Sequence, residues 1–240
     1  MNATTTALVG ATGGAGATRL CVEFAALLAR EGEDVCVLDA AYGTQGLAQY
    51  VTGRIDPDVT ALCTEERPLE DGLADPFFDA AGRVAFCPAF APFERVARAK
   101  TPDAARELER LVDEAAERFD HVLLDVPPVA ANQAVAAATT ADRRVLVTPD
   151  TRRGADALPR MAGRLRDVDA PADVELSNRG GAVVERADAS VPAGASGVPD
   201  APAVSGNETF AGEILEATEV ALGVELDVEA ESGLLGGLLQ

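Results

Sequence analysis

Residues 8–19 read Leu8-Val9-Gly10-Ala11-Thr12-Gly13-Gly14-Ala15-Gly16-Ala17-Thr18-Arg19. The apolar residues before Gly10 predict a strand, and the apolar residues after Arg19 predict a helix. α/β proteins bind phosphate groups with this succession of strand, glycine-rich turn and helix, because the glycines let the backbone approach the ligand and the helix start offers free N–H groups. The stretch therefore predicts a phosphate-binding loop.

This loop lacks its usual cation. In a working phosphate loop a small residue is followed, after four variable positions, by Gly-Lys-Ser/Thr, and the lysine reaches the phosphates. Ala11, Gly16 and Thr18 fit this pattern, whereas Ala17 occupies the lysine position. The sequence thus predicts the scaffold of a phosphate loop without its main positive charge.

The composition is that of a globular chain. It has 240 residues, of which 48% are hydrophobic, enough for a single α/β domain with a large core. No apolar run approaches the roughly 20 residues of a membrane-spanning helix. The polar N-terminus leads directly into the first predicted strand and shows no targeting signal, so we expect a cytoplasmic protein.

The charge is strongly acidic. The net charge is −20, and Lys100 is the only lysine among the 20 basic residues. Such a surface is typical of adaptation to high intracellular salt, and a binding face for a basic partner is the alternative. An acidic surface repels nucleic acid, so we expect no direct nucleic-acid binding.

The cysteines and the histidine do not predict a metal site. The cysteines are too widely spaced for a zinc or redox motif and lie in apolar segments, so we expect them to pack as small hydrophobic residues: Cys21, Cys36, Cys63 and Cys87. His121 is the only histidine, which excludes multi-histidine metal sites, and we expect a structural role for it.

Strands and helices alternate along the chain. Beyond the first strand, apolar runs predict strands at 34–39, 83–88, 120–125, 144–148 and 173–177. Helices are expected at 101–118, with Thr101 as N-cap, at 129–139 and at 152–167. A short helix is expected at 43–51. The segment 52–82 is expected to be irregular except for a short helix at 68–73. This alternation predicts a doubly wound α/β fold with a mainly parallel sheet and helices on both faces, of the P-loop NTPase type.

The composition changes near residue 186. We expect an α/β domain over 1–186 and a loop or linker over 187–206, which is rich in Pro, Gly and Ala. We expect a C-terminal helix packing on the domain within 207–226 and a flexible tail over 227–240. The tail's leucines could share one helical face, but a membrane anchor needs basic residues and the tail has none, so we expect no membrane binding.

Ligands of such sheets bind beyond the carboxyl ends of the strands. Residues 10–18, Asp39, Asp125 and Asn178 all follow predicted strands. Thr18 is placed to offer a hydroxyl to Mg²⁺, and Asp125 is the natural acid beside that metal.

At these strand ends the chain resembles the MinD/ParA group of deviant P-loop ATPases. The group's Lys-Gly-Gly-x-Gly-Lys-Thr corresponds to residues 12–18, and its Asp-x-Asp corresponds to Asp39-Ala40-Ala41. Its Asp-x-Pro-Pro corresponds to Asp125-Val126-Pro127-Pro128, and its Asn-Arg to Asn178-Arg179. The four motifs occur in the same order over about residues 5–180.

Three positions depart from the group's pattern. The lysine that reaches across the dimer is replaced by Thr12, the phosphate-loop lysine by Ala17, and the water-positioning second acid by Ala41. Arg19 lies about 200° around the helix from the lysine position and should point away from the phosphates. The resemblance therefore implies a degenerate site.

The resemblance implies a set of nucleotide-binding residues, if binding is retained: Thr12, Gly13, Gly14, Ala15, Gly16, Ala17, Thr18, Asp39, Asp125 and Asn178. Thr18 and Asp125 would hold Mg²⁺, and ATP would bind weakly. It further implies a non-hydrolysing regulator or scaffold in intracellular positioning, partitioning or assembly, working with a protein partner, an active relative or a second copy.

Three alternatives stay open. The first is a slow or partner-assisted ATPase of the same group. The second is a non-catalytic NAD-binding module, since Gly10, Gly13 and Gly16 with Asp39 beyond them also fit a dinucleotide-binding pattern. The third is that the glycines serve only a tight turn and that Asp39 and Asp125 are ordinary strand-end acids.

Overall fold

Seven strands form one sheet in the order β3-β2-β4-β1-β5-β6-β7. The computed structural model describes residues 3–184, 186–194, 200–205 and 207–226. All six strand pairings are parallel. The strands are β1 (Thr4–Gly10), β2 (Val35–Asp39), β3 (Val84–Cys87), β4 (His121–Val126), β5 (Arg143–Pro149), β6 (Val174–Asn178) and β7 (Ala189–Val191). The predicted fold class is confirmed.

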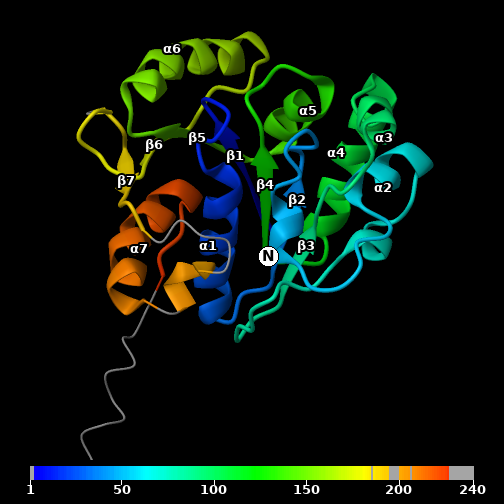
Figure 1. Cartoon of the computed structure of the whole chain (residues 1–240), viewed down its shortest axis with the longest axis horizontal. Coiled ribbons are helices and arrows are strands. Elements are labelled where there is room, and N and C mark those ends of the chain that lie inside the picture. The colour runs from blue at the N-terminus through cyan, green and yellow to red at the C-terminus, as the bar shows by residue number, and fades with distance from the viewer. Residues whose placement is uncertain (1–2, 185, 195–199, 206, 227–240) are drawn as a thin grey trace, which may run out of the picture.

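Helices cover both faces of this sheet. In Figure 1, α6 lies on the opposite side of the sheet from α1 and α7. The helices are α1 (Ala17–Arg30), α2 (Val59–Glu65), α3 (Phe93–Arg98), α4 (Pro102–Ala116), α5 (Asn132–Thr140), α6 (Arg152–Asp167) and α7 (Glu208–Leu222), and the short 3-10 turns are η1 (Leu47–Tyr50), η2 (Leu69–Gly72) and η4 (Ala203–Ser205). One core lies between the sheet and α4–α6, and the other between the sheet and α1 and α7.

The local sequence explains the main elements. The central strands are apolar and buried on both faces, as parallel sheets require. The predicted helix over 101–118 is α4, and the Thr101 side chain accepts a hydrogen bond from the backbone N–H of Ala104 at its start. All four cysteines are buried and unpaired, and burial raises the pKa of the Cys36 and Cys63 thiols to about 12. They pack as hydrophobic residues.

Two irregular regions contain structure that the sequence did not predict. Residues 52–82 include α2. Its N-cap is Asp58, whose carboxylate accepts the backbone N–H of Ala61. Residues 187–206, predicted as a loop or linker, contain β7 and η4. β7 pairs with β6 and so extends the sheet beyond residue 186. Burial of Val191 against the α7 side of the sheet is the physical reason for this addition.

The C-terminal part is tied to α1 by a buried carboxylate. Glu23 of α1 is only 1% exposed and accepts the backbone N–H groups of Ala203 (2.8 Å) and Val204 (3.1 Å). Arg30 at the other end of α1 donates to the Val204 carbonyl at 3.0 Å. The helix expected within 207–226 is α7, whose N-cap is Asn207. Among the described residues, no helix is both long and apolar enough to cross a membrane.

Candidate functional site

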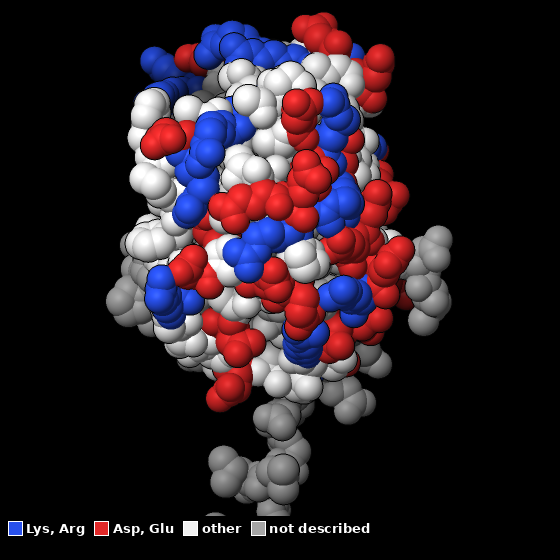
Figure 2. All heavy atoms as spheres, turned by 90° about the vertical axis from the view of Figure 1, so that its right-hand side faces the viewer, with Lys and Arg blue, Asp and Glu red and all other residues white. Residues whose placement is uncertain are grey.

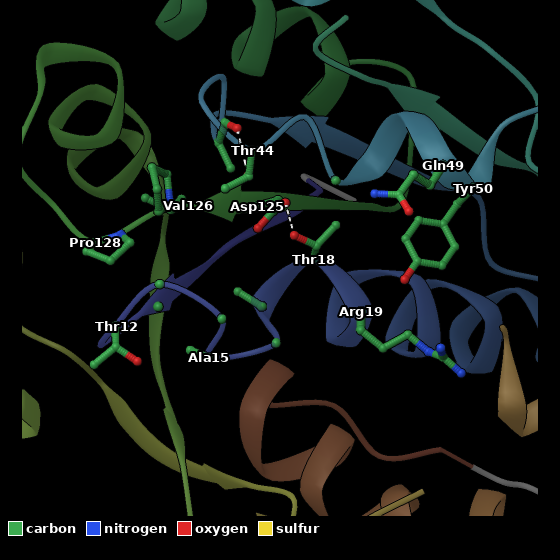
Figure 3. A pocket seen from close by; sticks show the side chains of 18 of the residues that line it. Thr12, Ala15, Thr18, Arg19, Thr44, Gln49, Tyr50, Asp125, Val126 and Pro128 are labelled. Atoms are coloured by element: carbon green, nitrogen blue, oxygen red, sulfur yellow. Dashed lines mark hydrogen bonds between the residues drawn. The ribbon is translucent and has the colours of Figure 1, made fainter. Parts of the chain in front are cut away.

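A cavity of about 290 Å³ opens where β1 and β4 end. Its walls come from the loop before α1, from the segment after β2 and from the prolines after β4 (Figure 3). The lining residues are Gly10, Thr12, Gly13, Gly14, Ala15, Gly16, Ala17, Thr18, Arg19, Ala41, Thr44, Gly46, Gln49, Tyr50, Asp125, Val126, Pro127, Pro128 and Arg179. Of the ten predicted site residues, eight line the cavity, and Asp39 and Asn178 do not.

The loop has a conformation that requires glycine. Gly14 and Gly16 adopt φ angles of 76° and 95°, which side-chain-bearing residues rarely adopt. A Cβ on Gly16 would lie 2.2 Å from Nδ2 of Asn178. The α1 N-terminus that follows has no side-chain cap and no acidic residue in its first turn. Its first N–H groups therefore remain available to an anion.

Thr18 and Asp125 meet at the floor of the cavity. The Thr18 hydroxyl donates to Oδ2 of Asp125 at 2.6 Å (Figure 3). β1 and β4 are neighbours in the sheet, so Thr18 in the first turn of α1 and the acid near the end of β4 are brought together although they are 107 residues apart. A hydroxyl and a carboxylate are ligands that suit Mg²⁺.

Asp39 lies beside Asp125 on the adjacent strand. The two are register partners of β2 and β4, with exposures of 0% and 1%. Burial, and secondly the charge of Asp125, raise the pKa of Asp39 well above its usual value. Burial raises the pKa of Asp125 to about 6, and the hydrogen bond from Thr18 acts in the opposite direction. The two acids thus resist simultaneous ionisation unless a cation compensates.

Asp39 braces the chain behind the cavity. Its oxygens accept the backbone N–H groups of Ala41 (2.7 Å) and Ala89 (3.2 Å). Asn178, one of the predicted nucleotide-binding residues, donates its amide to the carbonyl of Ala15 at 2.8 Å and so supports the loop. The structure therefore gives both residues a role in holding the loop and the sheet edge in place.

Solved structures share this fold at low sequence identity. No family model and no curated protein matches the chain. MinD in the MinC:MinD cell division complex of Aquifex aeolicus is 18% identical, with a TM-score of 0.75 over 95% of this chain and 99% of that one. The MinD/ParA fold is the fold of this chain.

Two further structures agree. The ParA family ATPase of Chlorobium tepidum is 16% identical, with a TM-score of 0.73 over 90% of this chain and 98% of its own. The septum site-determining protein MinD of Pyrococcus horikoshii, complexed with Mg-ADP, is 18% identical, with a TM-score of 0.67 over 80% and 82% of the two chains. The predicted resemblance to MinD/ParA proteins is confirmed at the level of the fold.

The MinD/ParA fold of this chain carries few cations at its loop. Thr12 and Ala17, which the sequence comparison predicts to replace the two lysines, line the cavity, and so does Ala41, which it predicts to replace the second acid. Arg19 donates to Glu23 at 2.6 Å, and in Figure 3 its side chain runs along α1 away from Thr18. Arg19 thus lies as predicted and does not replace the lysine.

One cation near the loop was not among the predicted site residues. Arg179, at the end of β6, donates from Nη1 to the carbonyl of Gly14 at 3.4 Å. It has a left-handed backbone with a φ of 69°, and the turn after it is held by Asp150, which accepts the N–H groups of Ala182, Val183 and Val184. Its place in the Asn-Arg motif was visible in the sequence, but its approach to the loop was not.

The residues present fit Mg²⁺ and a phosphate group only in part. The open space around Gly13 and Gly14 and the uncapped helix start form a cradle for an anion, and the Thr18 hydroxyl and Asp125 provide metal ligands. The cradle lacks the lysine that contributes most of the charge.

Proposed function

We propose that this chain is a MinD/ParA-group protein with a degenerate nucleotide site, which acts through protein–protein interaction and not through ATP hydrolysis. The observation that carries this proposal is the loop itself. Its left-handed glycines and the Thr18–Asp125 contact are intact, while Ala17 and Thr12 stand where the two lysines of the group would be. The conformation of a phosphate loop is retained, whereas the positive charges of the two lysines are absent.

The missing groups matter for rate. Phosphoryl transfer depends mainly on positioning and on stabilising the charge of the transition state. Loss of one well-placed stabilising group commonly costs about 10²–10³ in rate. Three such groups are absent here, at Thr12, Ala17 and Ala41. Efficient hydrolysis is therefore not expected of this site.

Weak nucleotide binding is compatible with what remains. The backbone of residues 12–18 would hold the phosphates, and Thr18 and Asp125 would hold Mg²⁺, which supplies positive charge to the phosphate oxygens when bound. Asp39 would act indirectly, by holding the segment after β2. Burial of the Asp39–Asp125 pair favours binding of a cation, because a cation would offset the cost of two adjacent negative charges.

The proposed process follows the relatives. One of them is a MinC:MinD complex, in which the fold is paired with a second protein. For this chain we infer a role as regulator or scaffold in positioning, partitioning or assembly, with a protein partner, an active relative or a second copy.

A binding and turnover experiment tests the proposal. ATP affinity and hydrolysis are measured on the purified protein in molar KCl with Mg²⁺. We expect weak or absent binding and negligible turnover. The double change Thr12→Lys and Ala17→Lys should raise ATP affinity, because it restores both cations to an intact loop. Micromolar ATP binding with turnover that Asp125→Ala abolishes would contradict the proposal.

A slow or partner-assisted ATPase is the second candidate, and Arg179 is the observation in its favour, since its guanidinium lies at the loop. Loss of the turnover in Arg179→Gln would support this candidate. The NAD-binding alternative requires an acid for the ribose, but Asp39 is fully buried, bonds two backbone N–H groups and does not line the cavity.

A further inference from the structure

Helix α6 is basic in an acidic protein. It carries five arginines and two aspartates within its 16 residues, whereas the whole chain has a net charge of −20. All five arginines are exposed. A quarter of the chain's 20 basic residues thus lies on the surface of this one helix.

These arginines differ from the arginines of the α4 region in their pairing. Arg106, Arg110 and Arg118, in and just after α4, each form an ion pair with a carboxylate. On the side where α2–α4 lie, basic and acidic side chains alternate over the surface (Figure 2). Within the described part of the chain, none of the α6 arginines forms an ion pair; Arg164 donates only to the Val129 carbonyl, at 3.2 Å.

Three of them form a line along the helix, which we call the arginine stripe: Arg153, Arg160 and Arg164. At 3.6 residues per turn they fall within an arc of about 40°, and their backbone positions are spaced by about 10 Å and about 6 Å along the axis. The buried face of α6, through Met161 and Leu165, is centred about 100° around the helix from the stripe. The stripe therefore runs along one flank of the buried face, and its three arginines are exposed.

Folding alone does not account for this arrangement. Arg160 and Arg164 are four residues apart, and like charges at that spacing destabilise a helix. Asp156, three residues after Arg153 and four before Arg160, lies beside the stripe and offsets part of its charge, so that a net excess of positive charge remains along this flank of α6. The chain has 40 acidic residues from which pairs could be built, as they are on α4. An external partner that supplies carboxylates would convert the repulsion within the stripe into attraction.

We propose that the arginine stripe is a docking surface for an acidic helix of a partner protein. Guanidinium groups bind carboxylates in a bidentate manner, and such contacts are stronger than those of lysine. A helix with carboxylates in the complementary i, i+4, i+11 order presents them at the same spacings as the stripe. The proposal rests on the proposed function only in assigning a protein partner, and it does not require nucleotide binding.

Charge and shape favour a protein over the other anionic partners. A nucleic acid would also meet the acidic surface of the rest of the chain, which repels it. A membrane-binding helix needs large apolar side chains beside its basic ones. The exposed large hydrophobic residues of the described chain are Phe77, Phe90, Phe93 and Val183, and none of them is on α6.

The test uses a pair of variants with equal net charge. Arg153→Gln with Arg160→Gln removes two charges from the stripe, and Arg106→Gln with Arg118→Gln removes two charges from paired arginines elsewhere. Binding is measured by fluorescence anisotropy with a labelled alanine-based helical peptide that carries glutamates at i, i+4 and i+11. The same peptide with its glutamates distributed around the helix, a short DNA duplex and phosphatidylglycerol vesicles serve as comparison probes.

We expect the full-length protein to bind the patterned peptide best. The affinity should fall about five-fold in the stripe variant and stay unchanged in the control variant, since each exposed ion pair contributes a modest amount. Circular dichroism melting should show that both variants are folded, and Arg153→Lys with Arg160→Lys should give an intermediate affinity.

Three results would overturn the inference: no binding of the patterned peptide by the unmodified protein, an equal loss in both variants, or stripe-dependent binding that is tighter for DNA or vesicles. ATP turnover in the same preparations tests the proposed function separately. Rapid turnover would contradict the degenerate site and leave the peptide result standing.

Discussion

Replacing Asp125 by asparagine should stabilise the protein in the absence of nucleotide and metal. Asp125 is buried beside Asp39, and its pKa is raised from 3.8 to about 6. Between these values the carboxyl ionises in the unfolded chain but stays protonated in the folded one. The folded state therefore loses stability as the pH rises through this window, and above about pH 6 the full cost is present.

The magnitude follows from the width of that window. A shift of about two pKa units corresponds to about 3 kcal/mol of unfolding free energy at pH 7. The asparagine would avoid this cost, and its side-chain carbonyl could still accept the Thr18 hydroxyl, while its NH₂ group needs a new acceptor. We expect a net gain of about 2 kcal/mol, which for a chain of this size raises Tm by about 4–8 °C.

The assay is thermal and urea unfolding in molar KCl with a chelator, at pH 7 and near pH 4. The gain should be large at pH 7 and small near pH 4, where the carboxyl is protonated in the folded state and only partly ionised in the unfolded chain. Asp113→Asn, which removes an exposed acid of α4, should change the stability little at either pH. A variant that is less stable than the parent at pH 7, or a gain independent of pH, would refute the reasoning.

Further changes test the structure around the loop. Gly16→Ala should destabilise the fold by about 2–4 kcal/mol, because it places an alanine in a left-handed conformation and its Cβ clashes with Asn178. Gly13→Ala is the control and should be nearly neutral, because the space around Gly13 is open. An equal effect of both changes in urea unfolding would contradict the loop geometry. Glu23→Ala should lower the free energy of unfolding by about 3 kcal/mol, because it leaves the N–H groups of Ala203 and Val204 without their acceptor. Glu216→Ala, at an exposed position, is the control. Similar urea midpoints for the two variants would argue against the buried contact.

The sequence predicted the sheet well because its signal is local. Each buried parallel strand is a continuous apolar run, and an acid marks the end of two of them, at Asp39 and Asp125. Parallel pairing then brings these ends to one edge. The contact between Thr18 and Asp125 follows from that topology, so eight of the ten predicted residues line one cavity.

The remaining features depend on contacts between distant parts of the chain. β7 has only three residues, and it is a strand because the edge of β6 offers it backbone partners. Asn178 supports Ala15 because the left-handed Gly16 leaves room for its amide, and no local pattern indicates this. The position of Arg179 against the loop depends likewise on the turn held by Asp150.

The buried Glu23 has a consequence for how the protein is synthesised. Besides Arg19, this carboxylate bonds the N–H groups of Ala203 and Val204, and these residues lie 180 and 181 positions further along the chain. A nascent chain that ends near residue 186 would hold all the loop residues and Arg19, which pairs with Glu23, but would lack the two backbone N–H groups that Glu23 accepts. We therefore expect the N-terminal loop and helix to reach their full stability during translation only after the chain extends past Val204.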